Sequence, residues 1–304
     1  MPVWEPRAEW LQEAVRSALA ADVDLELIVV DDGNPEPVRA LLDGVDDSRL
    51  VHLRVPHGGV SHARNAGTAQ ATGRFLRYAD ADDITAEHST ERLLILARGG
   101  AIAYEDTLVC DEELRPVKRI SSRLSGDVAV PTLLGRFECR HVSMLFPAEV
   151  VRRAGPWDSR LRLLEDFDFV LRCVEHAPVV PGEGTATLYR RHGASATLGR
   201  GAAAEAQRAR RIVVEGFFDR HAELRRTPVG RQAQRMVYAA EARAAVQQDR
   251  PLLAVARTLR LLPLAPREAV DIMLRAARRA ARLSSAATTR TTAPARAFLT
   301  RRAR

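Results

Sequence analysis

Apolar residues in the first part of the chain follow two patterns, short continuous runs and helical spacing. Short apolar runs predict β-strands at 25–30, 50–55, 74–79 and 101–104. Between them, apolar residues at helical spacing predict helices at 7–20, 36–43, 60–71 and 86–98. This alternation of strands and helices indicates an α/β protein built on a parallel sheet. Further along, the sequence predicts a helix that begins near Asp166 and β-like stretches near 185–191.

Charge divides the chain into two parts. The 304 residues carry a net charge of +7, but residues 200–304 hold 23 arginines and only eight acidic side chains. This second part is rich in alanine and arginine and has helical patterning, which places a boundary near residue 200. We therefore expect a domain at 1–199, a basic helical extension at 200–283 and a disordered basic tail at 284–304.

The basic extension has three interpretations. It could be a solvated helical bundle that completes the fold, or an amphipathic surface that contacts an anionic membrane. The membrane interpretation depends on arginines beside apolar residues: Ile272, Met273, Leu274, Arg275, Arg278, Arg279, Arg282 and Leu283. Nucleic-acid binding is not favoured, because no recognisable motif is present and Phe298 is the one aromatic residue beyond Tyr238.

An acidic cluster follows the predicted strand at 74–79. Asp80, Asp82 and Asp83 could share a hard cation, Mg²⁺ or Mn²⁺, whose shell is completed by substrate phosphate oxygens. Alone, the cluster is more typical of a solvated turn or a helix cap than of a metal site.

A second acidic pair, Asp31 and Asp32, follows the strand at 25–30. Ligands of open parallel α/β sheets bind outside the carboxyl ends of the strands, so both acidic groups are expected at one edge. A glycine-opened helix at 60–71 lies between them in the sequence, and its Arg64 could approach a base or a phosphate.

The order and spacing of these motifs resemble the inverting family 2 glycosyltransferases with the GT-A fold. The resemblance covers roughly residues 2–198. The matching segments are Ile28–Gly33, Ala63–Gly67, Ala71–Phe75, Asp80–Asp83, Gly155–Asp158, Glu165–Phe169 with Arg172, and Tyr189–His192 with Ser195. It implies a GT-A nucleotide-diphospho-sugar transferase fold, with a Rossmann-like, mostly parallel sheet and a C-terminal helical extension.

The beginning of the chain departs from this family. Met1–Pro6 aligns with a turn that follows the first strand in family members, so most of that strand is missing. Either the true start lies upstream or the sheet tolerates the loss. We favour the first explanation, because losing a central strand removes much buried apolar area.

The resemblance assigns the catalytic base to Asp166, which would deprotonate the acceptor hydroxyl in a reaction that inverts the anomer. Chemistry alone does not separate Glu165, Asp166 and Asp168, because each could cap the helix that they open. Trp157, also on the acceptor side, could stack on a sugar or serve as a packing anchor.

For the donor, the resemblance favours Asp82 as metal ligand and Asp80 as a ribose contact or second metal ligand. Asp83 is assigned to capping the following helix. His192 is a candidate further metal ligand or phosphate contact, against an ordinary surface role. His57, His62 and His141 show no metal-ligand pattern and receive no role. Asp31 or Asp32 would bind the base or ribose, with uracil favoured over guanine or thymine.

The expected function is metal-assisted transfer from a nucleotide-diphosphate sugar, preferably a UDP-sugar. The acceptor would be a hydroxyl of a glycan, a lipid-linked molecule or a small molecule in cell-envelope or glycolipid synthesis. The alternatives are a nucleotide-sugar-binding protein without turnover and a basic membrane-surface adaptor. A sugar nucleotidyltransferase is disfavoured, because no glycine-rich loop carries a basic residue near the N-terminus and the sole lysine is Lys118.

The sequence contains no signal peptide, no long apolar run and no close pair among its three cysteines. We therefore expect a cytoplasmic protein with reduced thiols; peripheral attachment to the cytoplasmic face of the membrane is the alternative.

Overall fold

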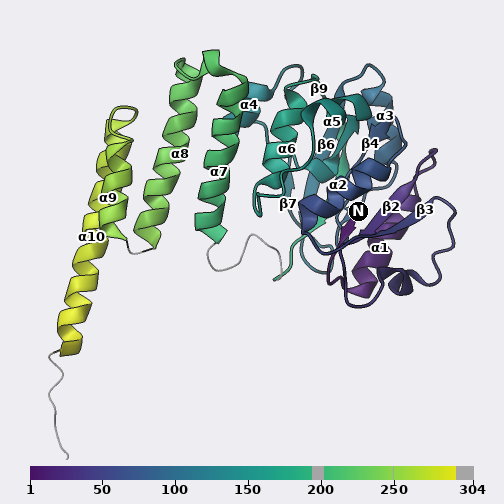
Figure 1. The fold of residues 1–304 in the computed structure, drawn as a ribbon, viewed down its shortest axis with the longest axis horizontal. Coiled ribbons are helices and arrows are strands. Elements are labelled where there is room, and N and C mark those ends of the chain that lie inside the picture. The colour runs from purple at the N-terminus through teal and green to yellow at the C-terminus, as the bar shows by residue number, and fades with distance from the viewer. Residues whose placement is uncertain (194–201, 249, 292–304) are drawn as a thin grey trace, which may run out of the picture. The chain divides into compact units, whose positions relative to one another are not determined.

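The computed structural model describes residues 1–193, 202–248 and 250–291, and it divides into two compact units, Met1–Ala222 and Glu223–Arg304 (Figure 1). The N-terminal unit contains β1 (Pro2–Val3), α1 (Ala8–Leu19), β2 (Leu27–Asp31), η1 (Val38–Leu42), β3 (Leu50–Arg54), α2 (Val60–Gln70), β4 (Phe75–Leu76), β5 (Ile84–Thr85), α3 (Ser89–Ala97), β6 (Ile102–Cys110), β7 (Pro116–Ile120), α4 (Ala129–Leu133), η2 (His141–Ser143), β8 (Met144–Pro147), α5 (Ala148–Ala154), α6 (Glu165–Val174), β9 (Val179–Arg190) and α7 (Ala202–Arg220). After the short turn η4 (Ala222–Leu224), the C-terminal unit contains α8 (Pro228–Gln247), α9 (Pro251–Leu259) and α10 (Pro266–Thr291).

The first sheet is parallel and has the strand order β1-β2-β3. Every residue of β2 is buried, as the continuous apolar run predicted for a strand covered on both faces. Leu11 and Val15 of α1 pack against Val3 and Val29 in this part of the core. The segment predicted as a helix at 36–43 forms only the 3₁₀ turn η1, which follows Pro37.

The second sheet has the order β4-β8-β6-β9-β5, with β7 paired to β6. Only β6 and β9 pair in parallel, whereas β4–β8, β5–β9, β6–β7 and β6–β8 are antiparallel. The expected α/β architecture is present, but parallel pairing is confined to the first sheet and to this one pair. β8 runs opposite to its neighbours β4 and β6, and the outer strands β7 and β5 run opposite to β6 and β9.

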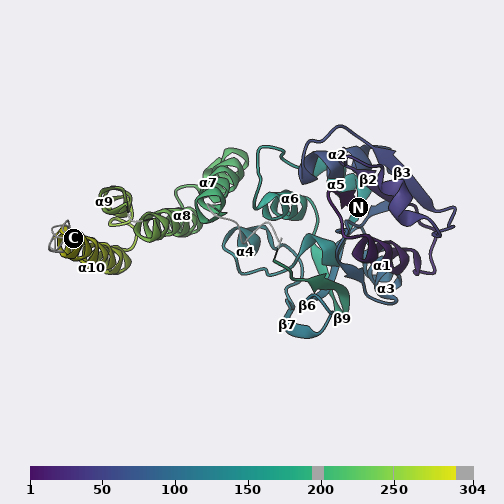
Figure 2. The same ribbon diagram turned by 90° about the horizontal axis from the view of Figure 1, so that it is seen from below.

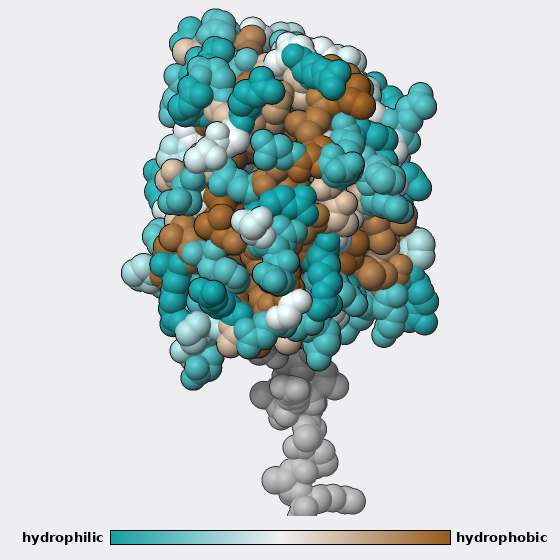
Figure 3. All heavy atoms as spheres, turned by 90° about the vertical axis from the view of Figure 1, so that its right-hand side faces the viewer, coloured by the Kyte–Doolittle hydropathy of each residue, from teal (hydrophilic) through white to brown (hydrophobic). Residues whose placement is uncertain are grey.

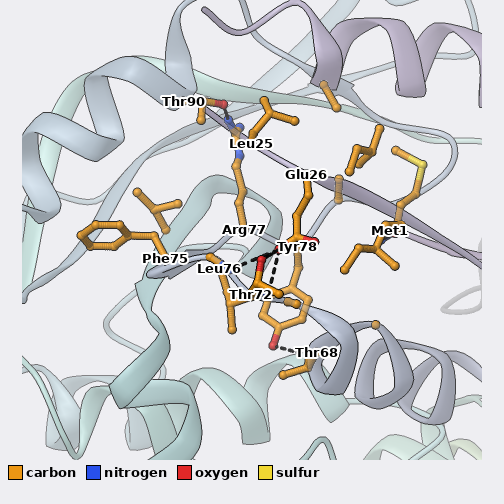
Figure 4. A pocket seen from close by; sticks show the side chains of 18 of the residues that line it. Met1, Leu25, Glu26, Thr68, Thr72, Phe75, Leu76, Arg77, Tyr78 and Thr90 are labelled. Atoms are coloured by element: carbon orange, nitrogen blue, oxygen red, sulfur yellow. Dashed lines mark hydrogen bonds between the residues drawn. The ribbon is translucent and has the colours of Figure 1, made fainter. Parts of the chain in front are cut away.

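A cavity of about 680 Å³ lies between the two sheets (Figure 4). Met1, Leu25 and Glu26 line one side of it, and Leu76 and Tyr78 line the other. β1, the first strand, is present but only two residues long. The face of this unit that bears the first sheet shows apolar areas among hydrophilic ones (Figure 3). β2 contributes Leu27, Ile28 and Val30 to the lining of the cavity.

The amine of Met1 closes one end of this cavity. It donates a hydrogen bond of 2.8 Å to the carbonyl of Ile28, and Val30 N donates to the Met1 carbonyl. Burial lowers the pKa of this amine to about 5. A charged ammonium is therefore disfavoured where the strand begins.

The C-terminal unit consists of α8, α9 and α10, which pack through small side chains such as Ala242, Ala254 and Ala276. α10 continues past Leu283 to Thr291, and the rest of the predicted tail, 292–304, lies outside the described residues. α7 groups with the N-terminal unit, so the division by contacts falls at Ala222. Within the described residues, no helix combines the length and the apolarity needed to span a bilayer.

Candidate active site

A cleft of about 960 Å³ opens in the N-terminal unit, where strand and helix ends from distant parts of the sequence meet. The sequence-predicted site residues that line it are Asp32, Arg64, Asp80, Asp82, Glu165, Asp166 and His192. Asp31 and Trp157 do not line it. The structure thus brings together carboxylates that are more than a hundred positions apart in the sequence.

Arg64 of α2 is the central cation of this cleft and is only 5% exposed. Its Nη2 lies 2.8 Å from Asp80 Oδ1, and its Nη1 lies 3.3 Å from Glu165 Oε1. The guanidinium also lies over the ring of Trp157, 4.4 Å from the ring centroid. Arg64 therefore joins the two acidic clusters electrostatically, a role the sequence did not indicate.

The Arg64 guanidinium controls the charge of Asp80. Burial alone would raise the pKa of Asp80, but Arg64, His141 and the Met1 amine together lower it below its ordinary value. Asp80 is therefore ionised at neutral pH. In contrast, burial and the neighbouring Asp166 raise the pKa of Glu165, although Arg64 opposes this.

Asp82 pairs with His192, whose Nε2 lies 2.8 Å from Asp82 Oδ2. The His192 ring packs near Trp10, and its Nδ1 is buried without a hydrogen-bond partner. Burial and the nearby Asp80 raise the pKa of Asp82, against the opposing effect of His192. The pair thus places one carboxylate and one imidazole at the same point of the cleft.

Asp83 does not cap the following helix, which corrects the role assigned to it from the sequence. Its Oδ1 accepts a hydrogen bond of 2.9 Å from the backbone N of Arg190, and α3 begins only at Ser89. Arg190 also donates through Nε to the Asp82 carbonyl. Asp83 therefore fastens the acidic loop to the end of β9, and burial raises its pKa well above the ordinary value.

Asp31 and Asp32 have different surroundings. The Asp31 carboxylate accepts hydrogen bonds from Asn34 and from Val38 N, so it holds the turn after β2. The Asp32 carboxylate accepts backbone hydrogen bonds from Gly58 and Gly59, both 2.9 Å, at the start of α2. Of the two, only Asp32 faces the cleft.

Asp166 is the carboxylate of the α6 trio that remains available to a ligand. Glu165 is engaged with Arg64, and Asp168 is held by Arg172 at 2.7 Å. The Asp166 side chain is 33% exposed, its Oδ1 accepts a hydrogen bond from Phe167 N, and the His141 ring lies 3.9 Å from its Oδ2. The geometry therefore separates three acids that the sequence left as alternatives.

His141 is the site residue that the sequence reasoning missed. Its Nε2 lies 3.9 Å from Asp80 Oδ2, and its Nδ1 lies 3.9 Å from Asp166 Oδ2. The ring is buried, and neither nitrogen has a hydrogen-bond partner. Burial lowers the pKa of His141 to about 4, so the imidazole is neutral at pH 7. The available signal was its position directly before the buried strand β8, where a polar residue reaches a sheet edge.

Trp157 belongs to the core, which corrects its proposed contact with an acceptor sugar. The side chain is 2% exposed, and Phe169 stacks on it with ring centroids 4.0 Å apart. Arg64 also lies over the ring. Asn65 Nδ2 donates a hydrogen bond to the Trp157 carbonyl, and Asn65 Oδ1 accepts one from Trp157 N. Trp157 is therefore a packing residue whose ring contacts the Arg64 guanidinium outside the lining of the cleft.

The donor atoms of the cleft suit a metal ion that is bound jointly by the protein and by substrate phosphate oxygens better than one bound by protein ligands alone. Among the described residues, no group of three or more His, Cys, Asp or Glu side chains is arranged to hold a metal ion. Asp82 and His192 supply two donors, and a divalent cation in a nucleotide site takes few protein ligands and several phosphate oxygens. Asp80 is committed to Arg64 through Oδ1. The Asp82–His192 pair is therefore the part of the cleft that suits Mn²⁺ or Mg²⁺.

Comparison with known proteins gives a family match for the N-terminal region. Residues 1–125, less than half of the chain, match the sequence profile described as glycosyl transferase family 2. This region is therefore similar to that family. The matched segment includes β2, α2 and the acidic loop at Asp80–Asp83, whereas the α6 carboxylates lie beyond it.

The chain is also similar to curated proteins whose names refer to PGL/p-HBAD biosynthesis and to minor teichoic acid biosynthesis. It is 29% identical over 164 residues to a PGL/p-HBAD biosynthesis glycosyltransferase of Mycobacterium bovis, which covers 52% of this chain and 61% of that protein. It is 29% identical over 100 residues to the minor teichoic acid biosynthesis protein GgaB of Bacillus subtilis, or 31% of this chain and 11% of that protein. The chain thus spans only part of the length of these relatives.

Solved structures show the fold. A crystal structure of S. aureus TarS 1-349 in complex with UDP-GlcNAc superposes with a TM-score of 0.57 at 17% identity, covering 93% of this chain and 90% of that one. A second TarS 1-349 structure gives a TM-score of 0.58 at 13% identity. The expected GT-A-like α/β fold with a C-terminal helical region is therefore confirmed.

Proposed function

We propose that this protein transfers a sugar from a nucleotide-diphosphate donor to an acceptor hydroxyl, with inversion at the anomeric carbon. The observation that carries the proposal is that one cleft holds the Asp82–His192 pair and the available carboxylate of Asp166. His141, 3.9 Å from both Asp80 and Asp166, lies between the two acidic clusters. In this proposal a donor site and a base share one cleft and act on one bound sugar.

On the donor side, Asp82 and His192 would hold the divalent cation, with Asp80 next to them. When bound, Mn²⁺ or Mg²⁺ would stabilise the negative charge that develops on the diphosphate leaving group. Asp32 would contact the base or ribose, since it faces the cleft. UDP is favoured as the nucleotide, supported by the UDP-GlcNAc complex of the structurally similar TarS.

On the acceptor side, Asp166 would accept the proton of the attacking hydroxyl. General bases are usually carboxylates or imidazoles within hydrogen-bond reach of the proton that they remove. Glu165 and Asp168 already have arginine partners, and the neutral His141 ring is enclosed. With Asp166 acting as a base, one direct displacement inverts the anomeric carbon and needs no covalent enzyme intermediate.

Arg64 would keep this arrangement compatible with a negatively charged donor. It neutralises Asp80 and shares charge with Glu165, which reduces repulsion between the cleft and the diphosphate. Because Arg64 is already committed to these two carboxylates, we assign it to ordering the site rather than to gripping a phosphate.

The acceptor belongs to cell-envelope or glycolipid synthesis in this proposal. Support comes from the names of the curated relatives, which refer to PGL/p-HBAD and minor teichoic acid biosynthesis. The acceptor would thus be a glycan, a lipid-linked molecule or a small molecule that presents a hydroxyl.

The proposal is tested by incubating the protein with a panel of UDP-sugars, Mn²⁺ and simple hydroxyl acceptors while UDP release is measured. We expect release from one donor, loss of it in Asp166→Asn, and retention in the matched control Asp46→Asn, which changes an exposed carboxylate far from the cleft. NMR of the product should show the inverted anomer. Donor binding without any UDP release would instead favour a nucleotide-sugar-binding protein.

A further inference from the structure

Large aliphatic side chains are exposed on the outer faces of α9 and α10. Eleven large hydrophobic side chains are exposed among the described residues, and five of them belong to these two helices. They are Leu252 (86% exposed), Val255 (41%), Leu259 (55%), Val270 (50%) and Leu274 (51%). Scattered exposed aliphatic residues are ordinary, but a concentration on two adjacent helices marks an interaction surface.

Helical spacing places these residues on defined faces. In α9, Leu252, Val255 and Leu259 recur at i, i+3 and i+7, opposite the buried Ala254 and Thr258. α9 and α10 are neighbours that also pack on α8, as the end-on view of the helices shows (Figure 2). The stripe on α9 is therefore turned away from the small core of this unit.

The outer face of α10 combines aliphatic and basic residues. Arg267, Val270, Leu274 and Arg278 recur at i, i+3, i+7 and i+11, whereas Ile272 points inward and is 2% exposed. Ile272, one of the apolar residues on which the membrane interpretation depended, thus does not belong to the exposed face. We call the exposed residues of both helices, Leu252, Val255, Leu259, Arg267, Val270, Leu274 and Arg278, the outer face.

The charge of the C-terminal unit is strongly positive, with 18 arginines against five acidic residues in 223–304. The acids of its helices are already engaged by arginines: Glu241 with Arg257, Glu268 with Arg235 and Arg243, and Asp271 with Arg275. No ion pair joins Arg267 or Arg278 to another residue in the part of the unit that the structure describes, and both are exposed. The outer face therefore carries uncompensated positive charge beside its aliphatic residues.

We propose that the outer face docks the protein on an anionic lipid surface. Aliphatic side chains on a helix lying in the interface enter the boundary between headgroups and acyl chains, and flanking arginines contact the lipid phosphates. Arginine suits the rim of such a surface because its stem is apolar while its guanidinium stays hydrated. This attachment is peripheral, and it is independent of the sugar-transfer chemistry of the N-terminal unit.

The test measures binding of the full chain to vesicles by flotation. We expect binding to vesicles of phosphatidylcholine with phosphatidylglycerol, little binding to phosphatidylcholine alone, and weakening when the salt concentration is raised. The variant Leu252→Asp/Leu259→Asp should bind about tenfold more weakly, because it removes two inserted side chains and adds repulsion. Ile95→Asp is the matched control: Ile95 is 59% exposed on α3 in the other unit, and its loss should leave binding unchanged.

A second variant, Arg267→Glu/Arg278→Glu, tests the contribution of positive charge to vesicle binding. Both positions are exposed, so the substitutions should not disturb folding. The variant should lose anionic-vesicle binding while keeping its helical circular dichroism and its thermal transition. Equal binding to neutral vesicles, or equal binding by the Leu252→Asp/Leu259→Asp variant and the Ile95→Asp control, would overturn the proposal. So would a concentration-dependent dimer that the leucine variant dissolves, or tighter binding to RNA than to anionic lipid.

Discussion

Replacing Arg64 by methionine would leave two largely buried carboxylates without the cation that they share. The guanidinium is 3% exposed as a side chain and lies 2.8 Å from Asp80 and 3.3 Å from Glu165. Removing one partner of a buried ion pair costs about 3–5 kcal/mol, because the remaining charge stays desolvated. The Asp80 and Glu165 side chains keep 24% and 16% exposure, so we expect a loss near the lower limit, about 3 kcal/mol at pH 7.

The pH dependence of this loss distinguishes electrostatics from packing. In the wild type, Arg64 lowers the pKa of Asp80, so the stabilising contribution of Asp80 is present at pH 7 and is lost only below its ordinary value of 3.8. Without Arg64, burial raises the pKa of Asp80 and strengthens the rise already present at Glu165. Protonating these carboxyl groups then relieves the variant, so the difference in unfolding free energy should shrink as the pH falls from 7 toward 5.

Urea denaturation of both proteins at pH 7 and pH 5 measures this difference. Arg115→Met is the matched control, since its side chain is 73% exposed and its loss should cost less than about 1 kcal/mol. Adding Asp80→Asn to Arg64→Met should recover part of the loss. The reasoning is refuted if the Arg64→Met difference stays constant with pH, or if Asp80→Asn gives no recovery.

Three further predictions follow from the site and its core. Trp157→Ala should lower the unfolding free energy by about 3–5 kcal/mol because it empties a packed core position, whereas Trp4→Ala, at 43% exposure, should cost far less in the same urea titration. His141 is neutral in the folded protein because its pKa is lowered from 6.5 to about 4, so the protein should lose stability as the pH falls from 6.5 to 4. A His141→Gln variant whose stability shows the same pH profile as the wild type would contradict this. Asp166→Asn should abolish transfer, while its donor affinity measured by calorimetry stays within about twofold of the wild type. Asp82→Ala should weaken metal-dependent donor binding at least about tenfold. Equal loss of donor affinity in both variants would refute their separate roles.

The sequence predicted the elements that deliver the site, because each has a strong local signal. The buried apolar run before Asp31 and the helical spacing around Arg64 gave strand β2 and helix α2 close to their observed bounds. The acidic loop at Asp80–Asp83 was found for the same reason, since carboxylates directly after an apolar run are conspicuous. Local pattern and position along the sheet edge were sufficient for these residues.

What the sequence did not reveal depends on contacts between distant segments. No local pattern shows that Arg64 lies between Asp80 and Glu165, or that His141 lies 3.9 Å from two carboxylates. Trp157 illustrates the same limit, because a Gly-Pro-Trp turn is compatible with an exposed or a buried ring until Phe169 is seen stacked on it. Pairwise placement of side chains, not element prediction, separates a catalytic candidate from a packing residue.

The proposed donor site is tested most directly by calorimetric titration of the wild type with UDP, GDP and dTDP, with and without Mn²⁺. Asp82→Ala is titrated in parallel, and Asp46→Asn serves as the control for an exposed carboxylate. We predict that UDP binds in the presence of Mn²⁺, that chelating the metal abolishes this binding, and that Asp82→Ala loses it while Asp46→Asn keeps it. Absence of nucleotide binding by the folded protein, or binding that neither the metal nor Asp82→Ala affects, would contradict the proposed donor site.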